Sequence, residues 1–63
     1  MPSNKNADLK ASYFDLLLIK HENKNNTVIG LERAIIRQRS IMDEEDVAYV
    51  DKQIGEYLDH LGN

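Results

Sequence analysis

Hydrophobic residues recur at three- and four-residue spacing along most of the chain, and two polar segments interrupt the pattern. Such spacing places side chains on one face of an α-helix. The interruptions are the asparagine-rich segment His21–Asn26 and the four consecutive acidic residues Asp43–Asp46. The pattern predicts an all-α domain, a helical hairpin or a three-helix domain, with helices at about residues 7–22, 28–41 and 44–61.

The first predicted helix is apolar over more than half of its circumference. A helix of this kind must pack against two neighbours, and both can come from the same chain or one from a second chain. Asp8, Asp15 and Glu22 share the remaining solvated face. The hydrophobic positions form two adjacent stripes, Leu9, Tyr13, Leu16 and Leu17 in one, and Ala7, Ala11, Phe14 and Leu18 in the other.

The second helix is expected to begin near Val28, because Thr27 or Asn26 can cap the free backbone amides of a first turn. Gly30 would then lie within that first turn, where a glycine costs less than in the middle of a helix. The buried stripe of this helix comprises Val28, Leu31, Ile35 and Met42, and Gln38 interrupts it.

The acidic junction at residues 43–46 marks a change of helical phase, because the stripe that ends at Met42 would continue through acidic residues. Asp43 and Asp46 have the spacing of a capping box, and Met42 and Val47 have that of a hydrophobic staple. We therefore predict that a third helix starts at an Asp43 cap. One continuous helix over residues 28–61 with a local shift of phase is the alternative.

The length of the chain limits the size of its core. With 63 residues and no cysteine, the chain buries only about 60% of its unfolded surface and has no disulfide to support it. We expect one domain over residues 1–63, with a flexible segment at 1–6, that is completed by self-association, most simply as a dimer. The residues assigned to this association form the apolar stripe of the third helix: Val47, Val50, Ile54, Tyr57 and Leu61.

Charge is distributed unevenly along the chain. The net charge is +1 over residues 1–24, +2 over residues 25–42 and −6 over residues 43–63. Segments of opposite charge favour mutual pairing, within the chain or between copies. Nucleic-acid binding depends on clustered cations and is disfavoured in an acidic chain. Arg33 and Arg37 lie four residues apart on one helix face, so a nucleic-acid-binding regulator is kept as an alternative.

The sequence lacks the residue patterns that mark common catalytic and metal sites. It contains no cysteine nucleophile, no serine in a nucleophile elbow and no glycine-rich phosphate loop. The acidic run does not have the spacing of a calcium loop. His21 and His60 lie near predicted helix C-termini, where a partly protonated imidazole interacts favourably with the helix dipole. We expect neither catalysis nor a metal or cofactor.

A further indication comes from Ser12, Tyr13 and Phe14, which a polar loop separates from Ile29, Leu31, Ile36, Arg37, Arg39, Ser40 and Ile41. This arrangement, within residues 9–41, resembles the helical hairpin of the sporulation histidine-kinase inhibitor family, with a loop about three residues longer. The resemblance implies binding to the dimerisation helices of a sensor kinase, without catalysis by the inhibitor. The related signature of small aspartyl-phosphate phosphatases, Ser-Gln-Glu-Leu-Asp, would fall on residues 51–55, where its acidic residue is missing. That activity is not expected.

The sequence as a whole predicts a small acidic regulatory protein that binds another protein through its helices, for example to inhibit a signalling protein. Phe14 and Leu18 are expected to dock on a partner helix, while Arg33 and Arg37 set its orientation. A structural subunit of a larger assembly is a second alternative. A polar N-terminal segment and a longest apolar run of only Leu16–Ile19 predict no signal peptide and no membrane span, hence a cytoplasmic location.

Overall fold

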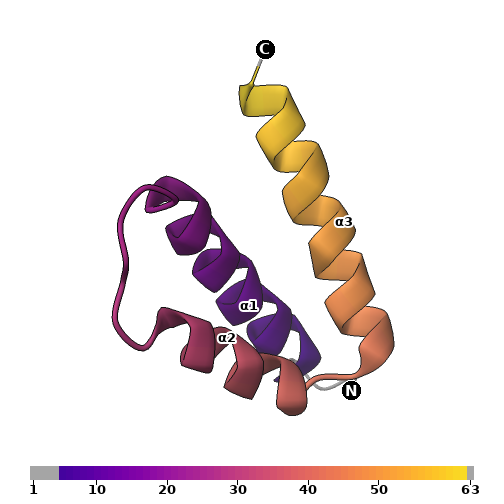
Figure 1. Cartoon of the computed structure of the whole chain (residues 1–63). Coiled ribbons are helices and arrows are strands. Elements are labelled where there is room, and N and C mark those ends of the chain that lie inside the picture. The colour runs from indigo at the N-terminus through magenta and orange to yellow at the C-terminus, as the bar shows by residue number, and fades with distance from the viewer. Residues whose placement is uncertain (1–4, 63) are drawn as a thin grey trace.

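In the computed structural model, which describes residues 5–62, the chain forms three α-helices and no strand within that range (Figure 1). Helix α1 spans Lys5–Glu22, α2 spans Leu31–Ser40 and α3 spans Glu44–Leu61. The prediction of a small all-α domain is confirmed. In the same described part of the chain, no helix has the length and apolarity that crossing a bilayer requires.

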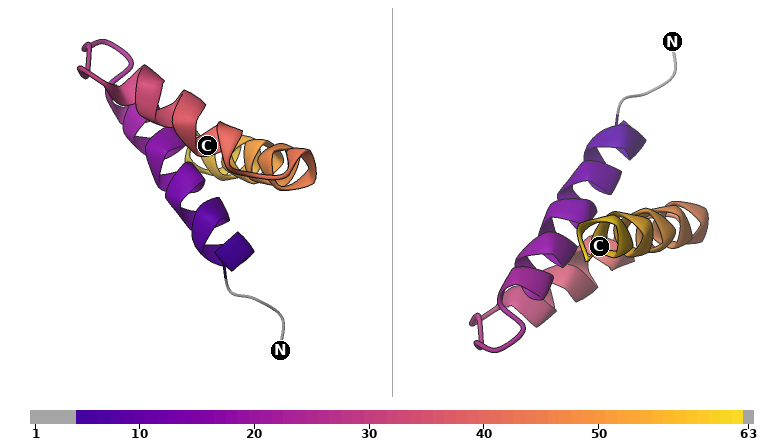
Figure 2. Two further views of the ribbon diagram at one scale, coloured as in Figure 1. Left: turned by 90° about the horizontal axis from the view of Figure 1, so that it is seen from below. Right: turned by 90° about the horizontal axis from the view of Figure 1, so that it is seen from above.

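Helix α1 packs against both of the other helices, while α2 and α3 make little contact with each other. Figure 2 shows α2 lying along α1, with α3 inclined to both of them. The prediction that the first helix needs two neighbours is therefore confirmed, and its own chain supplies both of them.

Helices α1 and α2 run in opposite directions. Near the end of α2, the Gln38 side-chain amide donates a hydrogen bond to the Leu9 carbonyl, with an Nε2 to O distance of 3.1 Å. At the other end, Lys20 Nζ and Glu32 Oε1 form a salt bridge of 3.1 Å. The salt bridge is exposed and contributes little to stability. Gln38, which interrupts the apolar stripe in the sequence, thus has a structural partner.

Helices α1 and α3 run in the same direction. Lys10 lies beside Tyr49, and one turn further along α1 the ring of Phe14 contacts Tyr57. Between these contacts the hydroxyl of Tyr13 reaches Asp51. The three helices therefore run up, down and up, with α1 packed against the other two. The short connection after α2 can reach the start of α3, because α3 starts beside the beginning of α1 (Figure 1).

The core is small. Among residues 6–62, four hydrophobic side chains are buried, Tyr13, Ile35, Val50 and Ile54, with Tyr13 only 1% exposed. Tyr13, Ile35 and Val50 form one cluster, and partly buried residues pack against it: Phe14, Leu16, Leu17, Leu31, Met42 and Val47. Several large hydrophobic side chains remain exposed: Ile19, Val28, Ile29, Ile36, Ile41, Tyr49, Tyr57 and Leu61. Single exposed hydrophobic residues are ordinary, but groups of them indicate contact surfaces.

The start of α2 differs from the prediction. Gly30, not Thr27 or Asn26, occupies the N-cap position and adopts a left-handed backbone with φ of 83°. Its carbonyl accepts the first helical hydrogen bond from the Ala34 amide at 2.9 Å. Val28 consequently lies outside the helix and is exposed. The chain reverses direction before α2 begins, and glycine adopts the required φ without steric cost.

The start of α3 agrees with the prediction in position but not in detail. Asp43 is the N-cap and its carbonyl accepts a 3.0 Å bond from the Val47 amide, so the alternative of one helix over residues 28–61 is wrong. Within residues 5–62 the Asp43 side chain makes no capping hydrogen bond, and the capping box is therefore not formed. The acids of the first turn still face the positive end of the helix dipole.

The expected flexible segment at residues 1–6 is only partly covered by the structure. Residues 1–4 lie outside the described residues, whereas residues 5–6 already belong to α1. Helix α1 ends at Glu22, and the Asn23 side-chain amide then donates a 2.8 Å hydrogen bond to the Ile19 carbonyl. This bond satisfies one of the carbonyls that a helix C-terminus leaves unpaired.

Candidate protein-binding site

A groove of about 310 Å³ lies between α1 and α3, on one side of their contact. On α1 it follows the second apolar stripe of the sequence, and on α3 it follows the exposed side of the first half of the helix. Leu18 continues the α1 side of this groove by helical spacing and is half-buried. The groove is lined by Lys10, Ala11, Phe14, Asp15, Tyr49, Val50 and Gln53.

Contacts with neighbouring side chains hold the aromatic rings at this groove in place. Phe14 and Tyr57 meet edge to face, with ring centroids 5.6 Å apart and planes inclined by 68°. The ammonium group of Lys10 lies 4.8 Å from the centroid of the Tyr49 ring. The Gln53 amide donates to the Tyr49 hydroxyl at 3.1 Å, which fixes the other end of that side chain. Preorganised aromatic side chains of this kind are common anchors of protein interfaces.

Charged residues lie at the groove and further along the two helices that form it. Asp15 lines it directly, and Glu22 lies two turns further along the same face of α1. On α3, Glu45 and Glu56 lie four residues before and seven residues after Tyr49, on the same side of the helix. All four are exposed, and none has a salt-bridge partner among residues 6–62. Of these four carboxylates only Asp15 lines the groove, and Lys10 lines it as well, so the apolar floor is bordered by one charge of each sign.

A second exposed surface, the outer face of α2, combines hydrophobic residues with arginines. Ile29 is 97% exposed and Ile36 is 65% exposed. Arg33 and Arg37 are exposed beside Ile36, and neither forms a salt bridge with any residue in the described range. The expected pairing of these two arginines with the acidic third segment is therefore not made within the part of the chain that the structure describes.

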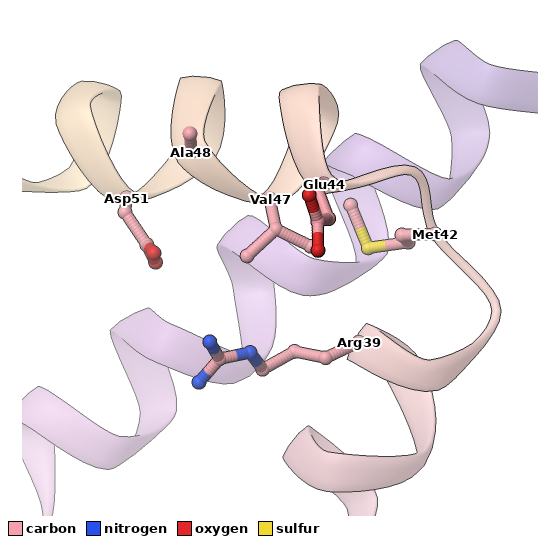
Figure 3. Close-up of a pocket in the computed structure, with 6 residues that line it drawn as sticks. All are labelled: Arg39, Met42, Glu44, Val47, Ala48 and Asp51. Atoms are coloured by element: carbon pink, nitrogen blue, oxygen red, sulfur yellow. The ribbon is translucent and has the colours of Figure 1, made fainter.

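Another hollow, of about 410 Å³, lies where α2 leads into α3. Figure 3 shows the Arg39 guanidinium and the Asp51 carboxylate pointing into it, with Met42 and Val47 on its α3 side. Met42 and Val47 both pack against the core, in agreement with their staple spacing. The hollow is open and carries both charges, so it has no clear preference for an anion or a cation.

Tyr13 is the buried polar group next to this hollow, and its hydroxyl donates a 3.0 Å hydrogen bond to Asp51 Oδ1. Burial raises the pKa of the Tyr13 hydroxyl above its ordinary value of 10.0, the hydrogen bond to Asp51 and the negative charge of Asp51 raise it further, and Arg39 opposes the shift. The sequence analysis placed Tyr13 in the core but missed this link. The sequence could have indicated such a contact, because a buried tyrosine hydroxyl needs a hydrogen-bond partner.

The structure distributes the predicted binding residues over different environments. Phe14 lines the groove and is half-buried, Leu18 is half-buried one turn further along α1, and Arg33 and Arg37 are exposed on α2. Of the five residues assigned to self-association, Val50 and Ile54 are buried against the rest of the chain and Val47 is half-buried. The remaining two, Tyr57 and Leu61, stay exposed. Tyr49 lies in the groove although the sequence analysis did not select it.

Comparisons of the chain with protein-family models, with curated proteins and with solved structures find no match. Among the described residues, no group of three or more histidine, aspartate or glutamate side chains could hold a metal ion. The groove and the outer face of α2 are therefore interpreted from their own geometry and charge.

Proposed function

We propose that this chain is a protein-binding module whose groove between α1 and α3 takes up a helix of another protein chain. The preferred ligand is an amphipathic helix with hydrophobic residues along one face. These residues would lie on Phe14, Leu18 and Tyr49, and charged groups of the ligand would pair with Lys10 and Asp15 at the edge of the groove.

One observation carries this proposal, namely the apolar groove between α1 and α3, which has Phe14 and Tyr49 among its lining residues and one charge of each sign, Lys10 and Asp15, at its edge. An apolar floor supplies the free energy of association, and rim charges mainly select the partner and its orientation. A chain of this size buries few side chains by itself, so contact with another helix also completes its packing.

The proposal can be tested with a blocked groove. Ala11→Lys places a long charged side chain at the exposed α1 wall of the groove, and Ser12→Lys places the same side chain on the next residue, which faces away from it. Proteins captured from a lysate by the wild type are identified, purified and measured for direct binding. We expect a partner whose dissociation constant rises at least tenfold for Ala11→Lys but not for Ser12→Lys. Equal binding by all three proteins would exclude the groove as the site.

A further inference from the structure

Met42 is open to solvent on one side and packed against the core on the other. It lies in the short connection between α2 and α3, where its amide donates a 3.2 Å hydrogen bond to the Arg39 carbonyl. Its half-buried side chain packs against the core cluster of Tyr13, Ile35 and Val50. The same side chain lines the open hollow where α2 leads into α3 (Figure 3). Small solutes can therefore reach a side chain on which the core packing depends.

The thioether of methionine is readily oxidised by peroxides. The sulfur lone pair attacks one oxygen of hydrogen peroxide, and an S–O bond forms as the O–O bond breaks. The departing hydroxide takes up the proton of the transferred hydroxyl and leaves as water, so the sulfur is oxidised and the peroxide is reduced. The chain has no cysteine, and its other methionine, Met1, lies outside the described residues. Met42 thus carries the one sulfur in the described part of the chain that can take up this oxygen.

We propose that Met42 is a site of reversible oxidation, and that its sulfoxide weakens the attachment of α3 to the rest of the chain. A sulfoxide is polar, so packing it against the core costs free energy that the thioether does not. Helices α2 and α3 make little contact with each other, so α3 is held by α1 and by the connection that carries Met42. A thiol-dependent methionine sulfoxide reductase removes the oxygen as water, oxidises a dithiol to a disulfide and restores the thioether.

Val50 extends the consequence to the groove between α1 and α3. It belongs to the cluster against which Met42 packs, and it is also among the residues that line the groove. A shift of α3 at this point moves Tyr49 relative to Phe14 on the opposite wall of the groove. Oxidation of Met42 therefore alters the shape of the groove. The oxidation itself does not depend on whether the groove binds another chain.

Peptide mass spectrometry measures whether the folded protein reacts. Trypsin cleavage after Arg39 and Lys52 places Met42 in a peptide of residues 40–52, separate from Met1. Hydrogen peroxide is added to the folded protein and to the protein in concentrated urea. We expect the two rates of Met42 oxidation to agree within about tenfold, because the side chain lines an open hollow. A rate that follows the unfolded fraction as urea is added would show that Met42 reacts only after unfolding, and would overturn the inference.

Urea denaturation followed by circular dichroism measures the effect on packing. Oxidation of the wild type should raise the unfolding equilibrium constant by about tenfold or more, and treatment with the reductase and dithiothreitol should reverse the change. Met42→Leu nearly conserves the side-chain volume and removes the sulfur. Peroxide should leave the stability of this variant unchanged, although Met1 is still present in it. A wild type that keeps its stability after Met42 is oxidised would overturn the inference.

A shifted methionine separates the position from the chemistry. Ile41 is 62% exposed, so Ile41→Met combined with Met42→Leu carries the same thioether on the solvent side. Peroxide should oxidise this double variant at least as fast as the wild type and change its unfolding equilibrium constant by less than about twofold. Equal losses of stability in the two proteins would overturn the role of the core contact.

NMR spectra of the ¹⁵N-labelled protein test the link to the groove. Oxidation should shift the amides of Val50 and Tyr49 in the wild type and leave them in place in the double variant. An oxidised wild type in which these two amides do not shift would overturn the link. Because no ligand is added, this result is independent of the proposed binding of another chain.

Discussion

The hydroxyl of Tyr13 in α1 donates a 3.0 Å hydrogen bond to Asp51 Oδ1 in α3, and 38 residues separate the two along the sequence. Tyr13 is the most buried side chain of the core, whereas Asp51 is exposed. The bond therefore joins the centre of the core to its surface. Apolar packing between α1 and α3 leaves rotation of α3 about its own axis weakly restricted, and a directional hydrogen bond restricts it.

Tyr13→Phe should destabilise the protein by about 1 kcal/mol, because the ring keeps its packing and only the hydrogen bond is lost. The measurement is urea denaturation followed by circular dichroism at 222 nm. Tyr49→Phe is the matched control, since the Tyr49 hydroxyl accepts its hydrogen bond from Gln53 at an exposed position. Its free energy of unfolding should change by less than about 0.5 kcal/mol. Equal losses for both variants would contradict the role assigned to Tyr13.

The same contact predicts a dependence of stability on alkaline pH. Burial and Asp51 raise the pKa of Tyr13 in the folded protein above 10.0, so the folded state holds this proton more tightly than the unfolded chain does. The contribution to stability is then complete below pH 10.0 and is lost as the pH rises through the higher folded pKa. Urea midpoints measured from pH 8 upward should fall more steeply for the wild type than for Tyr13→Phe. Parallel curves would exclude Tyr13 as a source of the effect.

Two glycines should respond to alanine in opposite directions. Gly30 has a φ of 83°, so Gly30→Ala should cost about 1 kcal/mol even though an added Cβ meets no described atom within 4 Å. Gly55 lies in the interior of α3, where an added Cβ likewise meets no atom of the described chain within 4 Å. Gly55→Ala should therefore raise stability by about 0.5 to 1 kcal/mol. Thermal unfolding followed by circular dichroism measures both, and a destabilised Gly55→Ala would indicate that another helix approaches this position.

The core positions could be predicted from the sequence because helical periodicity is a local property. Tyr13 and Ile35 belong to stripes that repeat every three or four residues, and these stripes face the core in the structure. The start of α2 could not be obtained in this way. Asn26, Thr27 and Gly30 are all residues that occur at N-caps, and the choice depends on where the chain must turn to return along α1.

The site was predicted in part. Phe14 and Leu18 were selected because their stripe exceeds what one neighbouring helix can cover. Phe14 lines the groove, and Leu18 lies one turn beyond it along α1. Tyr49 was missed because the sequence does not determine on which side of α1 the third helix packs. The same ambiguity placed Val50 and Ile54 in a self-association surface, although both are used within the chain. Periodicity defines a face but not its partner.

Ile35 and Ile36 provide the sharpest comparison between the core and the surface, because they are identical neighbours with opposite environments. Ile35 is 6% exposed and Ile36 is 65% exposed. Ile35→Ala should cost about 2 to 5 kcal/mol, which approaches the whole stability expected for a core of this size, so the variant should be largely unfolded by circular dichroism. Ile36→Ala should change the free energy of unfolding by less than about 0.5 kcal/mol. A folded Ile35→Ala variant of normal stability would contradict the core described here.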